Sequence, residues 1–414
     1  MGFKIQKELV YQIIFIICVA VPYLNNYELT FIVWSITALL TIRKKYSFSI
    51  LKLIVFFLII LSIAFISSIN QNFKSYNFIR DVAYLLKPVL GLLVGYQLCK
   101  SHFKNPLNTA INAGVFIAVV HLLIVGYTIL FRSVRTMHEL RMYAGYFSDF
   151  EIYILILLIF HREFQINIPL KKIRWFIVII SLSSFFYLAR TNFIQFIILF
   201  LALKGYFVLT KKSIVVLTTI IITTLVGYSA IYVYNPNRGA KGFEAFLFKI
   251  KNAPIEPFKT KIDVTNWKDF NDNYRSYENI LTIRQVGNAG VQDILIGQGL
   301  GSSIDLKKEV WLQSSYMRYI PFLHNGFMTI FLKSGLLGVL ILLLSIIYFF
   351  RIKKSDIKLI QNINYLFLGT GLFLFISYWV FMGFYFTVDT KTIIIGFLIS
   401  YKELYLKSNK ILDK

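Results

Sequence analysis

The sequence predicts an all-α, polytopic integral membrane protein with about 12 transmembrane helices and one large loop between two late helices. Hydrophobic residues make up 57% of the 414 residues and charged residues only 15%, which excludes a single water-soluble core. Apolar runs of roughly 17–25 residues recur along the chain, and this length crosses about 30 Å of hydrocarbon. One long polar segment, residues 235–322, interrupts them.

The apolar runs divide the chain into three parts. The N-terminal part, residues 1–234, contains about nine predicted spans, near residues 9–25, 28–42, 50–69, 80–99, 107–131, 148–161, 173–189, 191–209 and 213–234. The polar loop follows at 235–322. The C-terminal part, residues 323–414, contains about three spans, near residues 323–350, 358–384 and 388–405.

Basic residues fix the orientation of these spans. Lysine and arginine cluster at residues 43–45, 100–104, 162–174, 204–212, 351–358 and 402–414. With the predicted spans, every cluster falls on the side of the N-terminus, which the positive-inside rule makes cytoplasmic. Both termini are therefore predicted to be cytoplasmic and the loop to lie outside. Because the +24 net charge is dispersed in short turns without a recognised motif, we expect no nucleic-acid partner.

Three of the arginines predicted to lie on the outer side are candidates for binding an anion. Arg190 ends one apolar run and precedes another with almost no loop, so its guanidinium belongs at the membrane interface. Arg284 lies in a predicted helix over residues 276–295, and Arg275 comes just before that helix. Contact with lipid phosphates explains interfacial arginines in general. A planar, permanently charged guanidinium also suits the binding of a diphosphate.

His324 is the candidate acid–base group. Pro321 ends the loop just before it, so the histidine is expected near the first turn of the helix that re-enters the membrane. A neutral imidazole at that place is able to take a proton from a hydroxyl group.

The end of the loop also holds a glycine-rich turn, G-Q-G-L-G at 297–301, which a charged linker joins to His324. The turn is neither a Walker A loop nor a dinucleotide fingerprint, because no lysine–serine pair follows it and no parallel-sheet pattern surrounds it. Asp269 and Asp272 lack a third ligand at an obvious spacing, so they are interpreted as loop solvation. The sequence therefore predicts neither a metal site nor a cofactor.

Three segments resemble motifs of the O-antigen ligase and polymerase superfamily. L-A-R-T-N-F at 188–193 is similar to the S-R-T element that opens a span in that family. I-R at 283–284 followed by I-G-Q-G-L-G at 296–301 is similar to its arginine and GxGxG segment. H-N-G-F-M-T-I-F-L-K-S-G-L-L-G at 324–338 resembles the signature that ends its large loop.

The resemblance implies a glycosyltransferase in the bacterial inner membrane, with a periplasmic active site and an undecaprenyl-diphosphate-linked oligosaccharide as donor. On this hypothesis His324 orients or deprotonates the attacking hydroxyl, and Arg190 and Arg284 neutralise the leaving diphosphate. The matched motifs and their neighbours add further substrate-binding residues, namely Arg275, Gly297, Gly299 and Asn325. Aromatic residues of the loop either belong to the interfacial belt or stack on sugar rings: Trp267, Tyr274, Tyr277, Trp311, Tyr316 and Tyr319.

Two branches of the superfamily fit. A Wzy-type polymerase transfers the growing chain to a lipid-linked repeat unit, whereas a ligase transfers the finished chain to lipid A-core. L-K-S-G-L-L-G at 332–338 and R-D-V-A-Y-L-L-K-P at 80–88 resemble polymerases more closely. The resemblance also implies membrane lipid, a chain-length regulator and a flippase as partners. A lipid-linked oligosaccharide transporter is the alternative from another class, although the sequence shows no internal repeat of the kind many transporters have.

Overall fold

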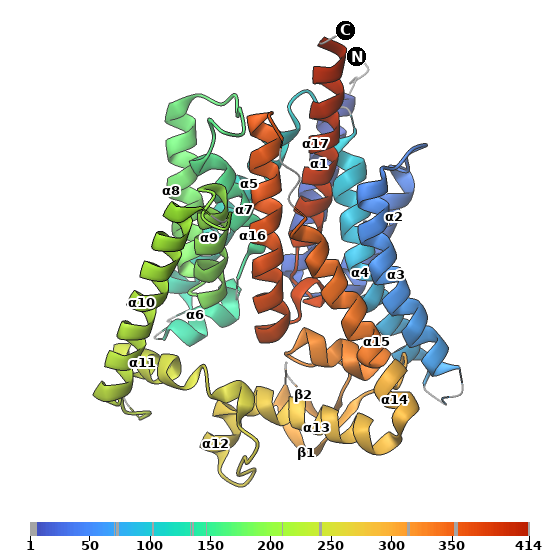
Figure 1. Cartoon of the computed structure of the whole chain (residues 1–414), viewed down its shortest axis with the longest axis vertical. Helices are drawn as coiled ribbons and strands as arrows, with labels where there is room; N and C mark the ends of the chain where they lie inside the picture. The colour runs from blue at the N-terminus through green and yellow to red at the C-terminus, as the bar shows by residue number, and fades with distance from the viewer. Residues whose placement is uncertain are drawn as a thin grey trace.

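The computed structural model describes residues 6–69, 71, 74–101, 103–132, 134, 136–145, 147–208, 210–239, 242–312, 315–351 and 355–412. Long helices pack side by side, and a layer of short helices with one β-hairpin covers one end of the bundle (Figure 1). Both termini lie at the opposite end. The chain is 74% helical, so the all-α class is confirmed at this level.

The N-terminal part consists of α1 (Lys7–Ala20), η1 (Val21–Leu24), α2 (Tyr27–Leu40), α3 (Phe48–Ser68), α4 (Ser75–Cys99), α5 (Pro106–Phe131), α6 (Met137–Ala144), α7 (Asp149–Ile159), α8 (Leu170–Phe186), α9 (Arg190–Leu203) and α10 (Lys211–Tyr234). The C-terminal part consists of α15 (Gly326–Phe349), α16 (Lys358–Val380), η3 (Gly383–Tyr385) and α17 (Lys391–Leu412). Each predicted span coincides with one of these helices. Many begin at a side chain that caps the first turn, including those of Asn26, Ser47, Ser148, Thr210 and Asn325.

Within the described residues, seven helical segments are long and apolar enough to cross a membrane: Lys7–Leu24, α3, α4, α5, α10, α15 and α16. The apolar helices α2 and α9 are shorter. Helix α7 has 11 residues, a length of about 16 Å that falls short of a 30 Å hydrocarbon layer. The total of about 12 crossings therefore stays a prediction.

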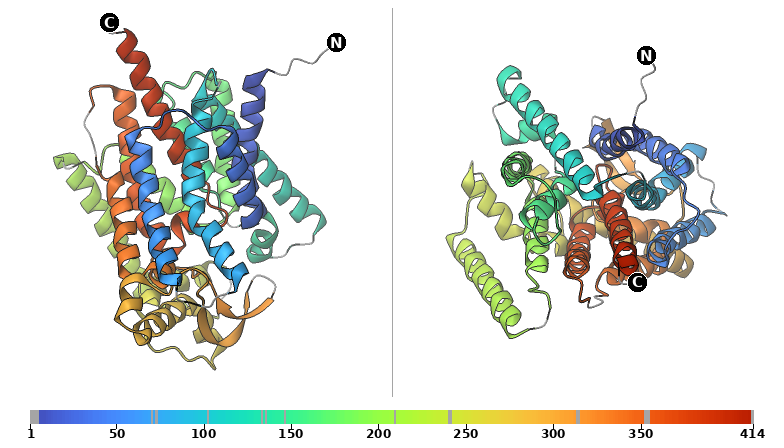
Figure 2. Two further views of the ribbon diagram at one scale, coloured as in Figure 1. Left: turned by 90° about the vertical axis from the view of Figure 1, so that its right-hand side faces the viewer. Right: turned by 90° about the horizontal axis from the view of Figure 1, so that it is seen from above.

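The centre of the bundle is the contact between α4 and α17. Here Gly95 lies so close to α17 that an added Cβ would overlap the backbone carbonyl of Ile393, and Gly396 lies equally close to Leu92. Helix α10 differs from α4 and α17, because no residue of its apolar stretch is buried in the bundle. It stands at the edge of the bundle (Figure 2) and exposes its apolar side chains around the whole helix.

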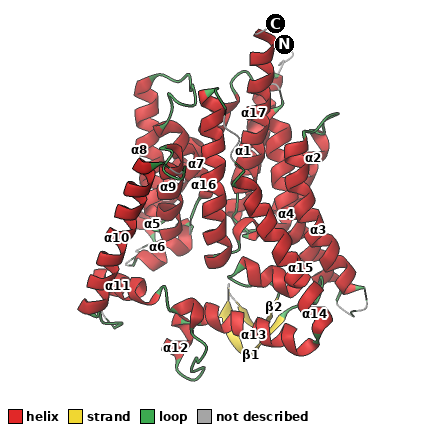
Figure 3. Ribbon diagram, viewed as in Figure 1, coloured by secondary structure: helices red, strands yellow, loops and turns green. Residues whose placement is uncertain are grey.

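The layer at the end of the bundle contains α11 (Phe243–Asn252), η2 (Glu256–Phe258), α12 (Trp267–Asp272), α13 (Tyr274–Ala289), α14 (Val291–Ile296), β1 (Ile304–Leu312) and β2 (Ser315–Ile320). The strands are antiparallel, with Ile304 opposite Ile320 (Figure 3).

Two expectations for this layer were wrong. The predicted continuous helix over 276–295 breaks at Gly290, whose φ of 119° is outside the helical range. The segment expected as a charged linker forms the hairpin, because its valine, isoleucine, tyrosine and tryptophan residues favour paired strands.

Candidate functional site

His324, just before α15, and Glu278, in the second turn of α13, form a hydrogen-bonded pair. The carboxylate of Glu278 accepts the backbone N–H of His324 at 3.0 Å and lies 3.0 and 3.1 Å from its Nδ1. Because an ionised carboxylate only accepts hydrogen bonds, this contact selects the tautomer of a neutral imidazole that has its proton on Nδ1 and its lone pair on Nε2. The glutamate side chain is 1% exposed and the histidine side chain 46%. The imidazole is therefore hydrogen-bonded on its buried side, and its other side is accessible to a substrate.

Tyr274 packs against the same histidine. The two rings meet edge to face, with their centroids 5.7 Å apart. Burial, and after it the negative charge of Glu278, raise the pKa of Tyr274 above its usual range. The phenol therefore stays neutral and fixes the orientation of the imidazole by packing.

Arg190, Arg275 and Glu256 are near enough for their charges to act on one another. Arg190 is the first residue of α9, Arg275 is the second residue of α13, and Glu256 begins η2. The two positive charges act on each other, and both act on the carboxyl group of Glu256. Burial raises the pKa of Glu256, and the two arginines only partly oppose this effect. Asp272 also acts on Glu256, but it is itself paired with Arg238, so the two arginines leave an excess of positive charge that favours an anionic ligand.

Helix α13 carries one residue of each of these two groups, Arg275 of the arginine group and Glu278 of the pair with His324. Arg275 and Glu278 are three residues apart, so they are neighbours on the helix surface with Cβ atoms about 5–6 Å apart. Arg284 follows Arg275 by two and a half turns, about 13 Å, and points to the opposite face of α13. Its side chain is exposed and takes part in none of the hydrogen bonds or ion pairs of the described residues. The structure thus places Arg190 near Arg275, and Arg275 on the helix whose Glu278 holds His324, whereas Arg284 lies on the opposite face of that helix.

The glycine turn fits into a break in α15. Its five successive backbone N–H groups, from Gly297 to Gly301, all donate to protein atoms: the carbonyls of Asp293 (2.8 Å), Leu332 (2.8 Å), Lys333 (3.1 Å) and Ala64 (3.3 Å), and Oδ2 of Asp81 (2.7 Å). Helix α15 breaks at Gly335, where φ is 62°. The N–H groups of Gly297 and Gly299 are therefore used to dock the turn. Their assignment to substrate binding stays a prediction.

Asn325, another predicted substrate-binding residue, caps α15. Its side-chain oxygen accepts the N–H of Met328 at 3.2 Å, and the residue is 2% exposed. This position explains why an asparagine follows His324: the cap fixes the first turn of the helix. A direct substrate contact by Asn325 stays a prediction.

A buried ion pair links α4 to α15. Nζ of Lys333 lies 2.6 Å from Oδ2 of Asp81, and both side chains are 0% exposed. Arg80 binds the other oxygen of Asp81 at 2.9 Å, and Lys333 also donates to the carbonyl of Ser302. The sequence analysis used the two segments around these residues only to choose between polymerase and ligase. Asp81 and Lys333 are charged residues in otherwise apolar runs, and this alone indicated that each needs a partner of opposite charge.

A second ionic network lies inside the bundle. Nζ of Lys391 lies 2.5 Å from Asp149 and also pairs with Asp389. Lys87 donates to the backbone carbonyls of Phe386 and Thr387. All four ionisable side chains are buried. The sequence analysis missed this network, which joins the start of α7 and the start of α17 to the centre of α4.

The sequence analysis also missed Glu278 and Glu256, because an acidic residue in a polar loop gives no sign of burial. The outer aspartates that it did consider are paired, Asp269 with Lys259 and Asp272 with Arg238. Compared with known proteins, the chain matches no family model, no curated protein and no solved structure. Its chemistry is therefore inferred from its own residues.

Proposed function

We propose that the chain is a polymerase of O-antigen or a similar surface polysaccharide. It transfers a growing glycan from undecaprenyl diphosphate to a lipid-linked repeat unit on the periplasmic face of the bacterial inner membrane. The observation that carries the proposal is the placement of Arg275 and Glu278 one turn apart on α13. This spacing puts Arg275, whose charge acts on that of Arg190, on the same helix as the carboxylate that holds His324.

The proposed reaction uses these groups in separate roles. The acceptor hydroxyl oxygen attacks the anomeric carbon of the donor, and its proton passes to Nε2 of His324. The bond from that carbon to the diphosphate breaks, and undecaprenyl diphosphate leaves with the electron pair. Arg190 and Arg275 neutralise the leaving group, while Glu278 stabilises the imidazolium that forms. Arg284 is retained from the family resemblance as a candidate for the same role, without support from its position.

The arrangement of the bundle supports the proposed orientation. The turns that carry the lysine and arginine clusters join helices at the end where both termini lie, and the layer with His324 lies at the other end (Figure 1). The positive-inside rule makes the first end cytoplasmic. A site in the outer layer beside the bundle is where a lipid-anchored diphosphate would meet its acceptor. Membrane lipid, a chain-length regulator and a flippase remain proposed partners.

A ligase would use the same site with lipid A-core as acceptor, so a genetic test separates the two branches. The gene is deleted in its own host and restored as wild type or as His324→Ala, and the surface polysaccharide is run on a gel. A single repeat unit on core in the deletion, with a ladder only for wild type, identifies a polymerase. Loss of all attached polysaccharide while long lipid-linked chains accumulate identifies a ligase. An unchanged ladder contradicts both.

Transport of a lipid-linked oligosaccharide is the second candidate. One observation favours it: the network of Lys87, Asp149, Asp389 and Lys391 places ionisable side chains inside the bundle, where many transporters have functional groups. An uptake assay in vesicles tests it. Movement of the labelled lipid across the vesicle membrane, lost in Asp149→Asn and kept in His324→Ala, would favour transport over transfer.

A further inference from the structure

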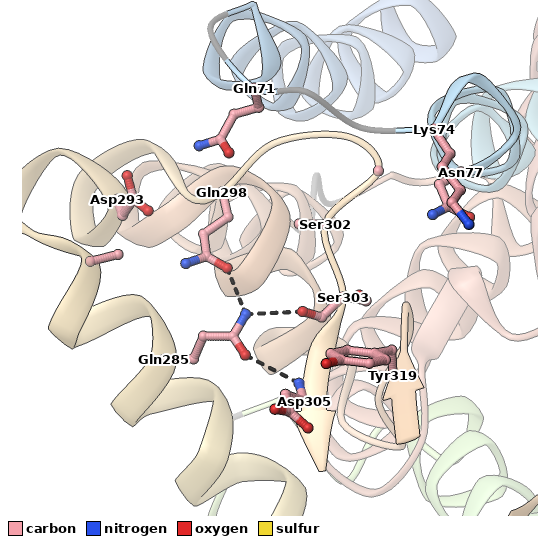
Figure 4. A pocket seen from close by; sticks show the side chains of 12 residues that line it. Gln71, Lys74, Asn77, Gln285, Asp293, Gln298, Ser302, Ser303, Asp305 and Tyr319 are labelled. Atoms are coloured by element: carbon pink, nitrogen blue, oxygen red, sulfur yellow. Dashed lines mark hydrogen bonds between the residues drawn. The ribbon is translucent and has the colours of Figure 1, made fainter. Parts of the chain in front are cut away.

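A cavity of about 770 Å³ opens beside the glycine turn (Figure 4). Its wall comes from residues just before and in the first turn of α4, from the helices α13 and α14, from the glycine turn and from the base of the hairpin. Figure 4 shows Gln71 and Asn77 on one side of the cavity, with Gln298 and Tyr319 across from them. These four side chains come from distant parts of the sequence and offer amide and hydroxyl groups to the same space.

Hydrogen bonds fix one wall of the cavity. The side-chain amide of Gln285 donates to Oε1 of Gln298 at 2.8 Å and to the carbonyl of Ser303 at 2.9 Å, and its own oxygen accepts the backbone N–H of Asp305 at 3.2 Å. The amide of Gln285 is thus fully used, and it sets the orientation of its neighbours. The donor side of the Gln298 amide has no partner among the described hydrogen bonds.

Tyr319 supplies an aromatic surface at the rim. It faces Asp305 across the strand pair and is 56% exposed. Arg318 binds both oxygens of Asp305, at 2.8 and 3.0 Å, which fixes the base of the hairpin. That guanidinium holds the pKa of Asp305 below its usual range, so the carboxylate only accepts hydrogen bonds. The cavity therefore combines one ring with fixed acceptors and donors.

This lining selects a class of ligand. Its only aliphatic side chain is that of Ala289, so a lipid tail or an apolar peptide would gain little by entering. Arg318 and Lys307 pair with Asp305, which leaves one acid, Asp293, and one base, Lys74, so the lining has no net charge that would favour an ionic ligand. A neutral ligand with many hydroxyl groups matches amides that both donate and accept, and its ring C–H groups match the face of Tyr319.

We infer that this cavity binds neutral sugar units of the glycan and holds the chain whose end reacts at His324. Gln285 follows Glu278 by seven residues, so the two share one face of α13 about 10 Å apart. Because Gln285 lines the cavity, one wall of the cavity lies about 10 Å along α13 from the carboxylate that holds His324. The choice of that glycan as the ligand rests on the proposed function, whereas the preference for a neutral, hydroxyl-rich ligand rests on the lining alone.

The test is a glycan array of neutral oligosaccharides, probed with the full-length protein in detergent. Tyr319→Ala is compared with Tyr319→Phe, which keeps the ring, and with Trp311→Ala. Trp311 is an aromatic residue of the same hairpin with 60% exposure, and it does not line the cavity. Wild type, Tyr319→Phe and Trp311→Ala are expected to bind alike, and Tyr319→Ala to bind about tenfold more weakly. No binding by wild type, or equal losses in Tyr319→Ala and Trp311→Ala, overturns the inference.

A transfer assay separates this inference from the proposed function. With a lipid-linked donor and acceptor, Tyr319→Ala is expected to raise KM for the glycan about tenfold and to leave kcat unchanged, because the ring binds but takes no part in the reaction. Tyr319-dependent glycan binding without any transfer by wild type would contradict the polymerase and keep the cavity as a glycan site. Transfer with an unchanged KM in Tyr319→Ala would contradict the cavity and keep the polymerase.

Discussion

The carboxylate of Glu278 accepts hydrogen bonds from both the backbone N–H and the Nδ1–H of His324, each at 3.0 Å. One bond fixes where the histidine stands at the start of α15, and the other fixes which of its ring nitrogens is free. A buried carboxylate that holds a half-exposed imidazole in this way also stabilises the positive charge that the ring acquires with a proton. Glu278 is therefore the residue on which the proposed role of His324 depends most directly.

We expect Glu278→Gln to lower kcat by about 10²-fold or more and to leave KM for the donor nearly unchanged. The amide keeps the size of the carboxylate, but it does not stabilise an imidazolium ion. Transfer by purified protein with a lipid-linked donor measures the effect. Glu309→Gln is the control, because Glu309 is an exposed acid on the hairpin. Equal activity of Glu278→Gln and Glu309→Gln would remove His324 from the role of base.

Arg275→Ala is expected to lower the transfer rate by about 10²–10³-fold, since it removes one of two guanidinium groups from the proposed diphosphate site. Arg275→Lys is expected to recover only part of the rate, because an ammonium group does not bind two oxygens in the same plane. Arg284→Ala is the matched comparison on the opposite face of α13 and is expected to have a much smaller effect. If Arg284→Ala loses as much activity as Arg275→Ala, Arg284 also takes part in neutralising the diphosphate, as the family resemblance implies. The site would then extend beyond Arg190 and Arg275.

Breaking the buried pair of Asp81 and Lys333 is expected to destabilise the protein by about 3–5 kcal/mol, because Asp81→Asn leaves Lys333 buried without a carboxylate and Lys333→Met leaves Asp81 with Arg80 as its one cation. Thermal unfolding in detergent of Lys333→Met and Asp81→Asn measures the loss. The double variant is expected to recover part of the stability of either single variant, since no uncompensated charge of the pair remains. Lys261→Met, at an exposed loop position, is the control. Full additivity of the two single losses would show that the pair does not act as a unit.

Gly299→Ala is expected to loosen the glycine turn from the bundle and to cost about 2 kcal/mol or more. Gly299 has a φ of 79°, and a Cβ there would lie 2.6 Å from the backbone nitrogen of Ser68. Gly287→Ala is the matched control, because Gly287 lies inside α13 with nothing within 4 Å of an added Cβ. That change is expected to stabilise the helix by up to about 1 kcal/mol. Limited proteolysis and thermal unfolding report both variants, and equal behaviour would contradict the tight docking of the turn.

The sequence by itself determined the helices and where the basic turns fall between them. Apolar runs predict where helices form because each run must satisfy its backbone hydrogen bonds within itself in a membrane. The start of α15 at Gly326, two residues after His324, was likewise close to its predicted place. These features depend on neighbouring residues only.

Tertiary structure alone decided which residues meet. Glu278 reaches His324 across 46 residues, and Asp81 reaches Lys333 across 252. No local pattern gives such distances, because the partners are brought together by the packing of whole helices. The same reason separates Arg284 from Arg275: both were chosen for their charge, but their spacing on α13 turns them to opposite faces. The sequence supplied the chemical groups, and the fold decided which of them share a site.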